Sequence, residues 1–500
     1  METKEPSNQS KFRRVSGIAL ILGSLALLPL LYATAPVRAV ESSPAQSVRA
    51  PSTSIPSRSP SLALEEFPTF FAGIQVNEPD HDRWAAALVA AGFDSVQVTL
   101  YARQQSWDGA TLYWDREAPW VVSEIRAAQR AGLRVILVMR VALEHGLPEN
   151  RHLWHGMIWP RDELVADWFE AYGEFVRWGS AMAAAEGVDL FAIGNELNSM
   201  TSTRPVSQIP DLYAYYGDPV RVAAVNQRLV GCAQAVLRSG AGEDLTQLDG
   251  GRYPDLAAML DSSARRHRDW AAVVAGSVVD LNRRNALHEA SWRALIQEVR
   301  QRYDGPLTYG ANFDQFDRVG FWDDLDALSV NAYFPLSLYG ASRGERRTTM
   351  AERWRQIGEQ LTATADLPLV MLELGWTRSA GSTVRPYSYD RVEVLETYDS
   401  PELTCVHWNS QPTDARERVD AMSALGDAVE AGAFPRLRGF TVWKMTTNPD
   451  HRAIEPFAVV LPGQRSGTTG SAAGAELDRI DEEYLAAAAR VQAVAVGDTR

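Results

Sequence analysis

Eight short apolar runs recur between residues 70 and 444, and this recurrence constrains the fold more than any other feature. Most runs are continuous rather than alternating in polarity, which is typical of strands buried on both faces of a parallel sheet. Segments with the 3.6-residue apolar spacing of helices separate them, and several end at Gly. The expected strands are 70–76, 95–101, 134–140, 190–195, 306–312, 326–334, 368–374 and 437–444, and the expected helices are 82–93, 121–132, 163–187, 291–305, 350–365 and 414–432.

Eight strands with a helix after most of them is the number of units that closes a (β/α)8 TIM barrel, so we expect an α/β protein of that architecture. A doubly wound open sheet competes, but no Gly-rich phosphate turn follows the first strand. We expect the barrel to span residues 65–460, with a long insertion after strand four at 201–285. Residues 461–500 are expected to form a linker and a last helix near 475–494 outside the barrel.

The N-terminus predicts export. Basic residues precede an apolar run from Val15 to about Ala35, so residues 1–40 are expected to be a signal peptide or an uncleaved signal anchor. Residues 41–64 are rich in Ser and Pro and are expected to form a tether. Export would permit a disulfide between Cys232 and Cys405, but their spacing does not show that they pair.

Charge narrows the choice of partners. The formal net charge is -14, and no basic block occurs beyond the N-terminus. Nucleic acid and anionic membrane surfaces are therefore not expected partners, whereas a neutral substrate suits this charge. No P-loop, nucleophilic Ser elbow or CxxC pair occurs, so no cofactor is expected. We expect a monomer.

Two carboxylates fall at strand ends, where barrel enzymes carry their catalytic groups. Glu196 directly follows Asn195 at the end of strand four, and Glu373 interrupts the apolar run "LVMLEL" at the end of strand seven. A buried carboxylate is costly unless it has partners, so each could simply pair with a core Arg. Two of them across one barrel mouth can instead act on a glycosidic bond, one as proton donor and the other as nucleophile.

Such a pair needs neighbours that separate the two pKa values, because the acid must keep its proton while the nucleophile stays ionised. Tyr333 and Arg103, at the ends of strands six and two, are expected to keep Glu373 charged. Asn195 is expected to hold the 2-hydroxyl of a sugar. Further candidates for substrate binding are Asn312 at the end of strand five and the loop residues Trp376 and Trp408, although these Trp rings could equally plug the core beneath the loops.

Four segments resemble the clan A glycoside hydrolases, and more closely glycoside hydrolase family 113, the β-1,4-mannanases and their relatives. They are "IGNEL" (193–197), "LSVNAYFPL" (328–336), "ELGWTRS" (373–379) and "FTVWK" (440–444). "WHGMIW" (154–159) and residues 408–430 are similar to the loop after that family's third strand and to its seventh helix. The resemblance covers roughly residues 67–450.

This resemblance implies a retaining mechanism with Glu196 as acid/base and Glu373 as nucleophile. It also implies that Asn195 contacts substrate, that Tyr333 touches the nucleophile and that Trp443 floors the central sugar site. One departure is at the end of strand three, where Met139-Arg140-Val141 stands in place of the family's His. We therefore expect an exported retaining enzyme acting on β-1,4-mannan. The alternatives are another clan A specificity, such as β-glucan or a glycoside, and a non-catalytic barrel that binds glycan at the envelope.

Two other signals are weaker. His145, His152 and His155 cluster in one loop, which invites a metal site, but no carboxylate joins them in a recognised pattern, so we expect no metal and a loop that lines the cleft. Lys444 could form a Schiff base in an aldolase. That interpretation leaves Glu196 and Glu373 without a role.

Overall fold

The computed structural model describes residues 64–144, 147–151, 153–201, 265–266, 269–270, 272–274, 281–337, 343–384, 386, 392–395, 405–408, 414–453, 455–463 and 472–497. The expected N-terminal segments, 1–40 and nearly all of 41–64, lie outside these residues, as do most of the insertion 201–285 and Cys232. No helix within the described ranges is both long enough and apolar enough to cross a membrane.

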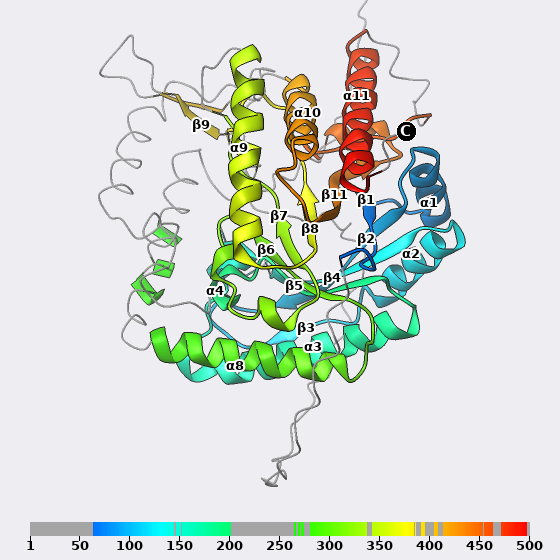
Figure 1. The fold of residues 1–500 in the computed structure, drawn as a ribbon. Helices are drawn as coiled ribbons and strands as arrows, with labels where there is room; N and C mark the ends of the chain where they lie inside the picture. Colours follow the sequence, from blue (N-terminus) through cyan, green and yellow to red (C-terminus); the bar gives the residue numbers. More distant parts are fainter. Residues whose placement is uncertain are drawn as a thin grey trace, which may run out of the picture.

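Eight parallel strands close into a barrel, as the sequence predicts (Figure 1). Each strand pairs with the next around the ring, and β1 closes it by pairing with both β2 and β11. The barrel strands are β1 (Phe70–Gln75), β2 (Ser95–Gln104), β4 (Arg134–Leu143), β5 (Leu190–Asn195), β6 (Leu307–Asn312), β7 (Leu328–Asn331), β8 (Leu369–Leu374) and β11 (Leu437–Thr446). Strands β2 and β4 each run three residues beyond the predicted ends.

Helices cover the outside of the barrel (Figure 1). They are α1 (His81–Ala90), α2 (Ala118–Arg130), α3 (Val165–Ala185), α8 (Leu281–Arg300), α9 (Arg343–Thr364), α10 (Arg416–Glu430) and α11 (Ala472–Ala495). The chain between β6 and β7 makes only the short 3-10 turns η6 (Phe316–Arg318) and η7 (Trp322–Asp324), so no α-helix separates this pair of strands. Helix α8 begins inside the range predicted for the insertion.

The predicted last helix is α11, and it packs beside α10 on the outer surface. A buried ion pair joins the two helices, because Arg418 of α10 contacts Asp481 of α11 and both side chains are fully buried. Asp481 also accepts from Arg452 Nη2 at 2.5 Å and from the backbone N–H of Val460 at 2.9 Å. Helix α11 thus covers the barrel after its last strand, in the position of an eighth helix.

Small additional strands extend the rims. β3 (Leu112–Tyr113) pairs antiparallel with the end of β2, and β12 (Val459–Val460) pairs with the end of β11. A separate antiparallel hairpin joins β9 (Val392–Leu395) and β10 (Cys405–Trp408). The single helical turn α4 (Asn198–Thr201) follows β5 directly.

Two apolar layers form the core. The larger cluster lies between strands and helices, and it includes the odd-numbered Leu137 and Met139 of β4. The smaller cluster fills the barrel interior and includes the even-numbered Ile136 and Val138 of the same strand. Because side chains alternate along a strand, the next even-numbered residue, Arg140, continues the series that faces the interior, at its upper end.

Candidate active site

Glu196 follows β5, and a local break in the strand places it. Ala192 pairs with Thr308 and Asn195 with Gly310, so three steps along β5 match two along β6, which is a β-bulge. Glu196 itself has φ 51°, in the left-handed region that a non-Gly residue rarely adopts. The bulge and this conformation turn the chain from the strand into α4 and leave the carboxylate at the barrel mouth.

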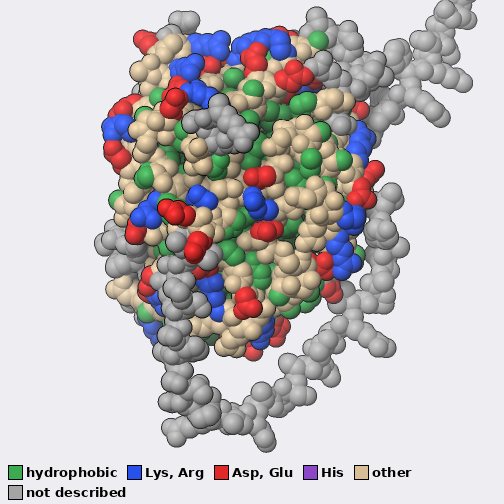
Figure 2. All heavy atoms as spheres, turned by 45° about the vertical axis from the view of Figure 1, so that its right-hand side comes forward, with side chains coloured by type: hydrophobic (Ala, Val, Ile, Leu, Met, Phe, Trp, Pro, Cys, Tyr) green, Lys and Arg blue, Asp and Glu red, His purple; other side chains and the backbone are tan. Residues whose placement is uncertain are grey.

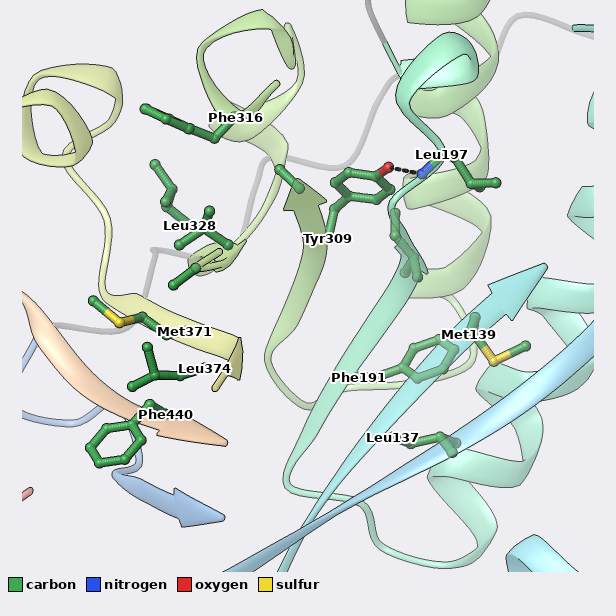
Figure 3. Packing of buried hydrophobic residues seen from close by; sticks show 14 of the residues in the cluster. Leu137, Met139, Phe191, Leu197, Tyr309, Phe316, Leu328, Met371, Leu374 and Phe440 are labelled. Atoms are coloured by element: carbon green, nitrogen blue, oxygen red, sulfur yellow. Dashed lines mark hydrogen bonds between the residues drawn. The ribbon is translucent and has the colours of Figure 1, made fainter. Parts of the chain in front are cut away.

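Hydrogen bonds on both sides of Glu196 hold this conformation. Its own N–H donates to the carbonyl of Gly310 at 2.8 Å. The next N–H, that of Leu197, donates to the hydroxyl of Tyr309 at 2.8 Å, the dashed line in Figure 3. The ring of Tyr309 is buried in the core that packs behind β6. The position of Glu196 is thus anchored to the hydrophobic core rather than to a loop.

Glu373 lies in β8 beside a second irregularity. Val330 pairs with Met371, but the next residue, Asn331, pairs with Glu373, so Leu372 is an extra residue on β8. Regular alternation from the interior residues Val370 and Leu372 would direct Glu373 toward the helices. The bulge instead allows it to face the mouth, where its side chain is 2% exposed.

Arg140 bridges the two carboxylates. Its Nη2 lies 2.5 Å from Glu196 Oε2, and its Nη1 lies 2.8 Å from Glu373 Oε1. The guanidinium is buried, which by itself lowers the pKa of Arg140. The charges of Glu373 and Glu196 outweigh this effect and raise the pKa above its usual value. One permanent cation therefore holds both candidate catalytic groups, at the strand end where the sequence departs from the family's His.

Glu373 receives two more hydrogen bonds. The hydroxyl of Tyr333 donates to Oε2 at 2.8 Å, which places Tyr333 where the sequence predicts it. The Nδ2 of Asn195 donates to Oε1 at 3.1 Å, and Asn331 donates in turn to Asn195 Oδ1 at 3.2 Å. A side chain at Gly310 would collide with this Asn195 oxygen, so the glycine makes room for the amide.

Glu196 has a second partner in His155. The His155 Nε2 lies 2.9 Å from Glu196 Oε2, and the ring is buried. This residue belongs to η2 (His155–Met157), in the loop expected to line the cleft. The other two His of the predicted cluster, His145 and His152, lie outside the described residues. Within the described part of the chain, no group of three or more metal-binding side chains gathers.

The two carboxylates share their charge unequally. Burial raises the pKa of Glu196, but Arg140 and His155 outweigh this effect and lower it to about 2. Burial raises the pKa of Glu373 to about 7, and the charge of Glu196 acts in the same direction, against the lowering effect of Arg140. The two titrations are coupled, so the pair keeps one proton near neutral pH that the two carboxyl groups share.

A third acidic side chain lies close to Glu196. Asp314 follows the end of β6 and accepts from Asn198 Nδ2 at 3.3 Å. Burial raises the pKa of Asp314 to about 6, and the negative charge of Glu196 adds to the effect. Asp314 stands two residues beyond the predicted strand 306–312, so the end of that strand was the sequence signal for its place near the mouth.

Trp443 lies at the base of the site. Its ring is 2% exposed and packs with Ile74, Tyr333 and Phe457. The Arg140 guanidinium lies 5.6 Å from the ring centre and the Lys444 ammonium lies 4.7 Å from it. Lys444 is also paired with Glu455 at 3.4 Å. Lys444 is therefore held in an ion pair with Glu455, which does not favour the alternative role of Lys444 as a Schiff-base nucleophile.

Arg103 does not contact Glu373, contrary to the expectation from the sequence. It forms ion pairs of 3.9 and 4.0 Å with Glu117 and Glu144, and its side chain is 41% exposed. The Arg that neutralises Glu373 is Arg140, two residues lower on the neighbouring strand. The sequence signal for it was the cation at the end of strand three, which also interrupts an apolar run.

Three further candidates have different outcomes. Asn312 ends β6 at the mouth, but its Oδ1 accepts from the N–H of Phe313 at 2.9 Å, and it contacts neither Glu196 nor Glu373. Trp376 packs edge-on against Trp354 and Tyr484, which lie in the outer helices α9 and α11, so its ring belongs to the core beneath the loops. The backbone of Trp408 belongs to β10, and its side chain lies outside the described part.

Comparison with known proteins identifies one family. The sequence profile described as Glycoside Hydrolase Family 113 matches residues 78–207 and 270–402, which is more than half of the chain. No curated protein matches the sequence. Solved structures with a similar fold include a GH113 β-mannanase from Alicyclobacillus acidocaldarius in complex with ManMIm, at 17% identity and TM-score 0.48, covering 84% of this chain and 100% of that chain.

Two other solved structures illustrate the range of similar folds. A GH113 β-1,4-mannanase has 17% identity and TM-score 0.47, and the match covers 83% of this chain and 99% of that one. An exo-β-1,4-mannosidase from Opitutaceae bacterium strain TAV5 has 11% identity and TM-score 0.39, and the match covers 85% of this chain and 60% of that chain. The barrel itself is established by the strand order described above.

Proposed function

Because this chain belongs to glycoside hydrolase family 113, and is therefore a glycoside hydrolase, we propose that it cleaves β-1,4-mannan with retention of configuration. The observation that carries the proposal is the pair Glu196 and Glu373 on one guanidinium at the barrel mouth. Two carboxyl groups that share one cation lie close together. That favours the narrow spacing of retaining enzymes, roughly 5 Å, over the wider gap that accommodates an attacking water.

The contacts of Glu373 support the assignment of the two roles that the family resemblance implies. Glu373 accepts three hydrogen bonds, from Tyr333, Asn195 and Arg140, and all three stabilise a carboxylate. Glu373 is therefore the nucleophile that attacks the anomeric carbon, and Glu196 is the acid/base. Double displacement needs the shared proton on Glu196 when the sugar binds. We infer that Arg140 shifts its contact from Glu196 toward Glu373 at that stage, which raises the pKa of Glu196.

Several features support a neutral polysaccharide as substrate. The net charge of the chain is -14. On the face shown in Figure 2, Lys and Arg side chains are interspersed with Asp and Glu rather than gathered into a basic patch. We assign Asn195 to a sugar hydroxyl and Trp443 to the floor of the central subsite, as the family resemblance implies. The same geometry would serve β-glucan or a glycoside, so the choice of mannan rests on the family.

Release of reducing sugar tests the proposal. A chain that starts near residue 63 would be assayed on mannan, glucomannan, xylan and β-glucan, and the anomer first formed would be followed by NMR. We expect cleavage of mannan with the β-anomer released first. If only another polysaccharide is cleaved, that polysaccharide is the substrate instead of mannan. If the α-anomer is released first, the mechanism is inverting rather than retaining. If the folded protein binds a glycan without cleaving it, the binding-only alternative is supported.

We further propose that the protein is exported and monomeric, with its barrel outside the cytoplasm. The proposal rests on the basic and apolar N-terminal segment, residues 1–40, followed by a Ser/Pro-rich tether. Fractionation of cells that express the full chain tests it. N-terminal sequencing of the exported protein then separates cleavage within residues 1–40 from retention as an anchor, and gel filtration of the barrel gives the oligomeric state.

A further inference from the structure

The inner face of β2 rises out of the barrel directly beside the catalytic pair. In the register of β2 with β4, Gln97 pairs with Ile136 and Thr99 with Val138, and both partners belong to the interior cluster. Gln97 confirms the direction, because its side chain accepts from Thr441 of β11 at 2.8 Å across the interior. The odd-numbered side chains of β2 therefore face the interior.

The odd-numbered, inward-facing side chains of β2 continue above the catalytic pair. Tyr101 pairs with Arg140, and Arg103 pairs with Ala142. Because Tyr101 pairs with Arg140, and Arg140 contacts both Glu373 and Glu196, the side chain of Tyr101 stands at the level of the carboxylates. Two residues along a strand correspond to roughly 7 Å, so Arg103 stands one tier above Tyr101, opposite a side chain that is only a methyl group.

Strand β3 adds an aromatic ring to this upper tier. Tyr113 lies directly opposite Arg103 in the antiparallel pairing of β2 with β3, so the two side chains are on the same face. Tyr113 is 51% exposed, whereas the adjacent Trp114 turns the other way and packs on Phe175. A half-exposed Tyr beside a half-exposed Arg, on the wall that carries Arg140, presents a ring face and N–H donors.

The charges at this tier suit a neutral sugar. Arg103 forms ion pairs with both Glu117 and Glu144, so its own charge is matched and does not favour a uronate over a neutral sugar. Both separations, 3.9 and 4.0 Å, exceed hydrogen-bond length, which leaves guanidinium N–H groups able to donate to hydroxyls. Amphipathic rings stack on the apolar faces of sugars, as Tyr113 could here.

We propose that Arg103 and Tyr113 form a binding subsite for a neutral hexose unit of the glycan, outside the sugar at the catalytic pair. This inference rests on the proposed cleavage of a β-linked glycan. It assigns Arg103 a sugar hydroxyl as its ligand rather than Glu373, and it predicts that the enzyme prefers chains long enough to reach the upper tier.

The test compares a long and a short substrate, β-1,4-mannohexaose and 4-nitrophenyl β-mannobioside. We expect Tyr113→Ala and Arg103→Ala to lower the ratio of kcat/KM for the hexaose to that for the bioside by on the order of tenfold. Tyr113→Phe, which keeps the ring, should retain most of the ratio. Arg130→Ala is the matched control, since Arg130 is a half-exposed, ion-paired Arg on the outer helix α2. An unchanged ratio in Tyr113→Ala and Arg103→Ala would overturn the inference while the proposed function stands.

If the wild type cleaves neither substrate, the proposed function fails, and the subsite is then tested by measuring the binding of oligosaccharides. Calorimetry with manno-, cello- and xylohexaose would then be done on Glu373→Gln, alone and combined with Tyr113→Ala. Weaker binding of a hexaose in the combined variant supports the subsite. Equal binding in the two variants, or no binding of any hexaose, rejects it.

Discussion

Arg140 Nη2 lies 2.5 Å from Glu196 Oε2, and the two side chains are 4% and 8% exposed. The same guanidinium contacts Glu373 at 2.8 Å, so a single buried cation sets the charge of both carboxylates. A buried charge that loses its partner is costly, and these three groups are therefore interdependent.

Removing either carboxylate should nearly abolish activity. We expect Glu196→Gln and Glu373→Gln each to lower kcat/KM on the polysaccharide by roughly 10³-fold or more, because each group acts in the transition state. Azide distinguishes the roles. With an activated aryl glycoside, azide should restore turnover to Glu196→Ala as a β-glycosyl azide, and it should not give that product with Glu373→Ala. The reverse pattern would exchange the two roles.

The activity of the wild type should fall above about pH 7, where the pair loses the proton it shares, since burial raises the pKa of Glu373 to about 7. Arg140→Gln removes a charge that lowers the pKa values of both carboxylates. The alkaline limb of kcat/KM should therefore move to higher pH in Arg140→Gln, with a lower maximum. A pH profile recorded beside the surface control Arg130→Gln checks this, and a limb that stays in place argues against Arg140 as the shared cation.

Ionisation of the buried Glu373 should lower the stability of the folded protein at alkaline pH. Its folded pKa of about 7 is above the ordinary value of 4.5, so its protonated form favours the folded state below pH 4.5, and that contribution is lost as the pH rises toward 7. Glu373→Gln should thus raise Tm relative to the wild type at pH 8, by about 2 °C or more, and by less at pH 4.5. Calorimetric scans at the two pH values measure the difference. A Tm gain equal at both would show that ionisation is not the cause.

Gly310 should be needed for catalysis more than for folding. Gly310→Ala would place a methyl group against Asn195 Oδ1 and displace the amide from Glu373. We expect a loss of about 10²-fold in kcat, as small misplacements in a site can cause, with a folded circular dichroism spectrum. The matched control is Gly344→Ala in α9, where an added Cβ meets nothing within 4 Å. Normal turnover by Gly310→Ala would contradict this account of Asn195.

Helix α11 should be integral to the barrel. Asp481→Ala leaves Arg418 buried without its carboxylate partner and removes one partner of Arg452, so we expect a loss of about 3–5 kcal/mol in unfolding free energy. Denaturant titration beside the exposed control Glu482→Ala measures it. The double variant Arg418→Met/Asp481→Leu should recover much of the loss. If Asp481→Ala unfolds like the control, α11 does not depend on this ion pair.

The local sequence determined much of this protein. Continuous apolar runs and 3.6-residue spacing located all eight strands and the main helices, because burial on both faces and amphipathic packing leave direct marks on composition. The same strand ends contained Glu196, Glu373, Asn195, Tyr333 and Trp443, which the barrel brings to one mouth. Each of these features can be recognised within a single strand and the residue that follows it.

What only the tertiary structure decided depends on neighbours from other strands. The bulges that direct Asn195 and Glu373 inward are register shifts between two strands, so neither strand alone contains them. The choice of Arg140 rather than Arg103 as the partner of Glu373 follows from strand stagger around the barrel, and the burial of Trp376 follows from the packing of α9 and α11. Charge sharing across the mouth is set by distances of a few ångströms, which spacing in the sequence does not encode.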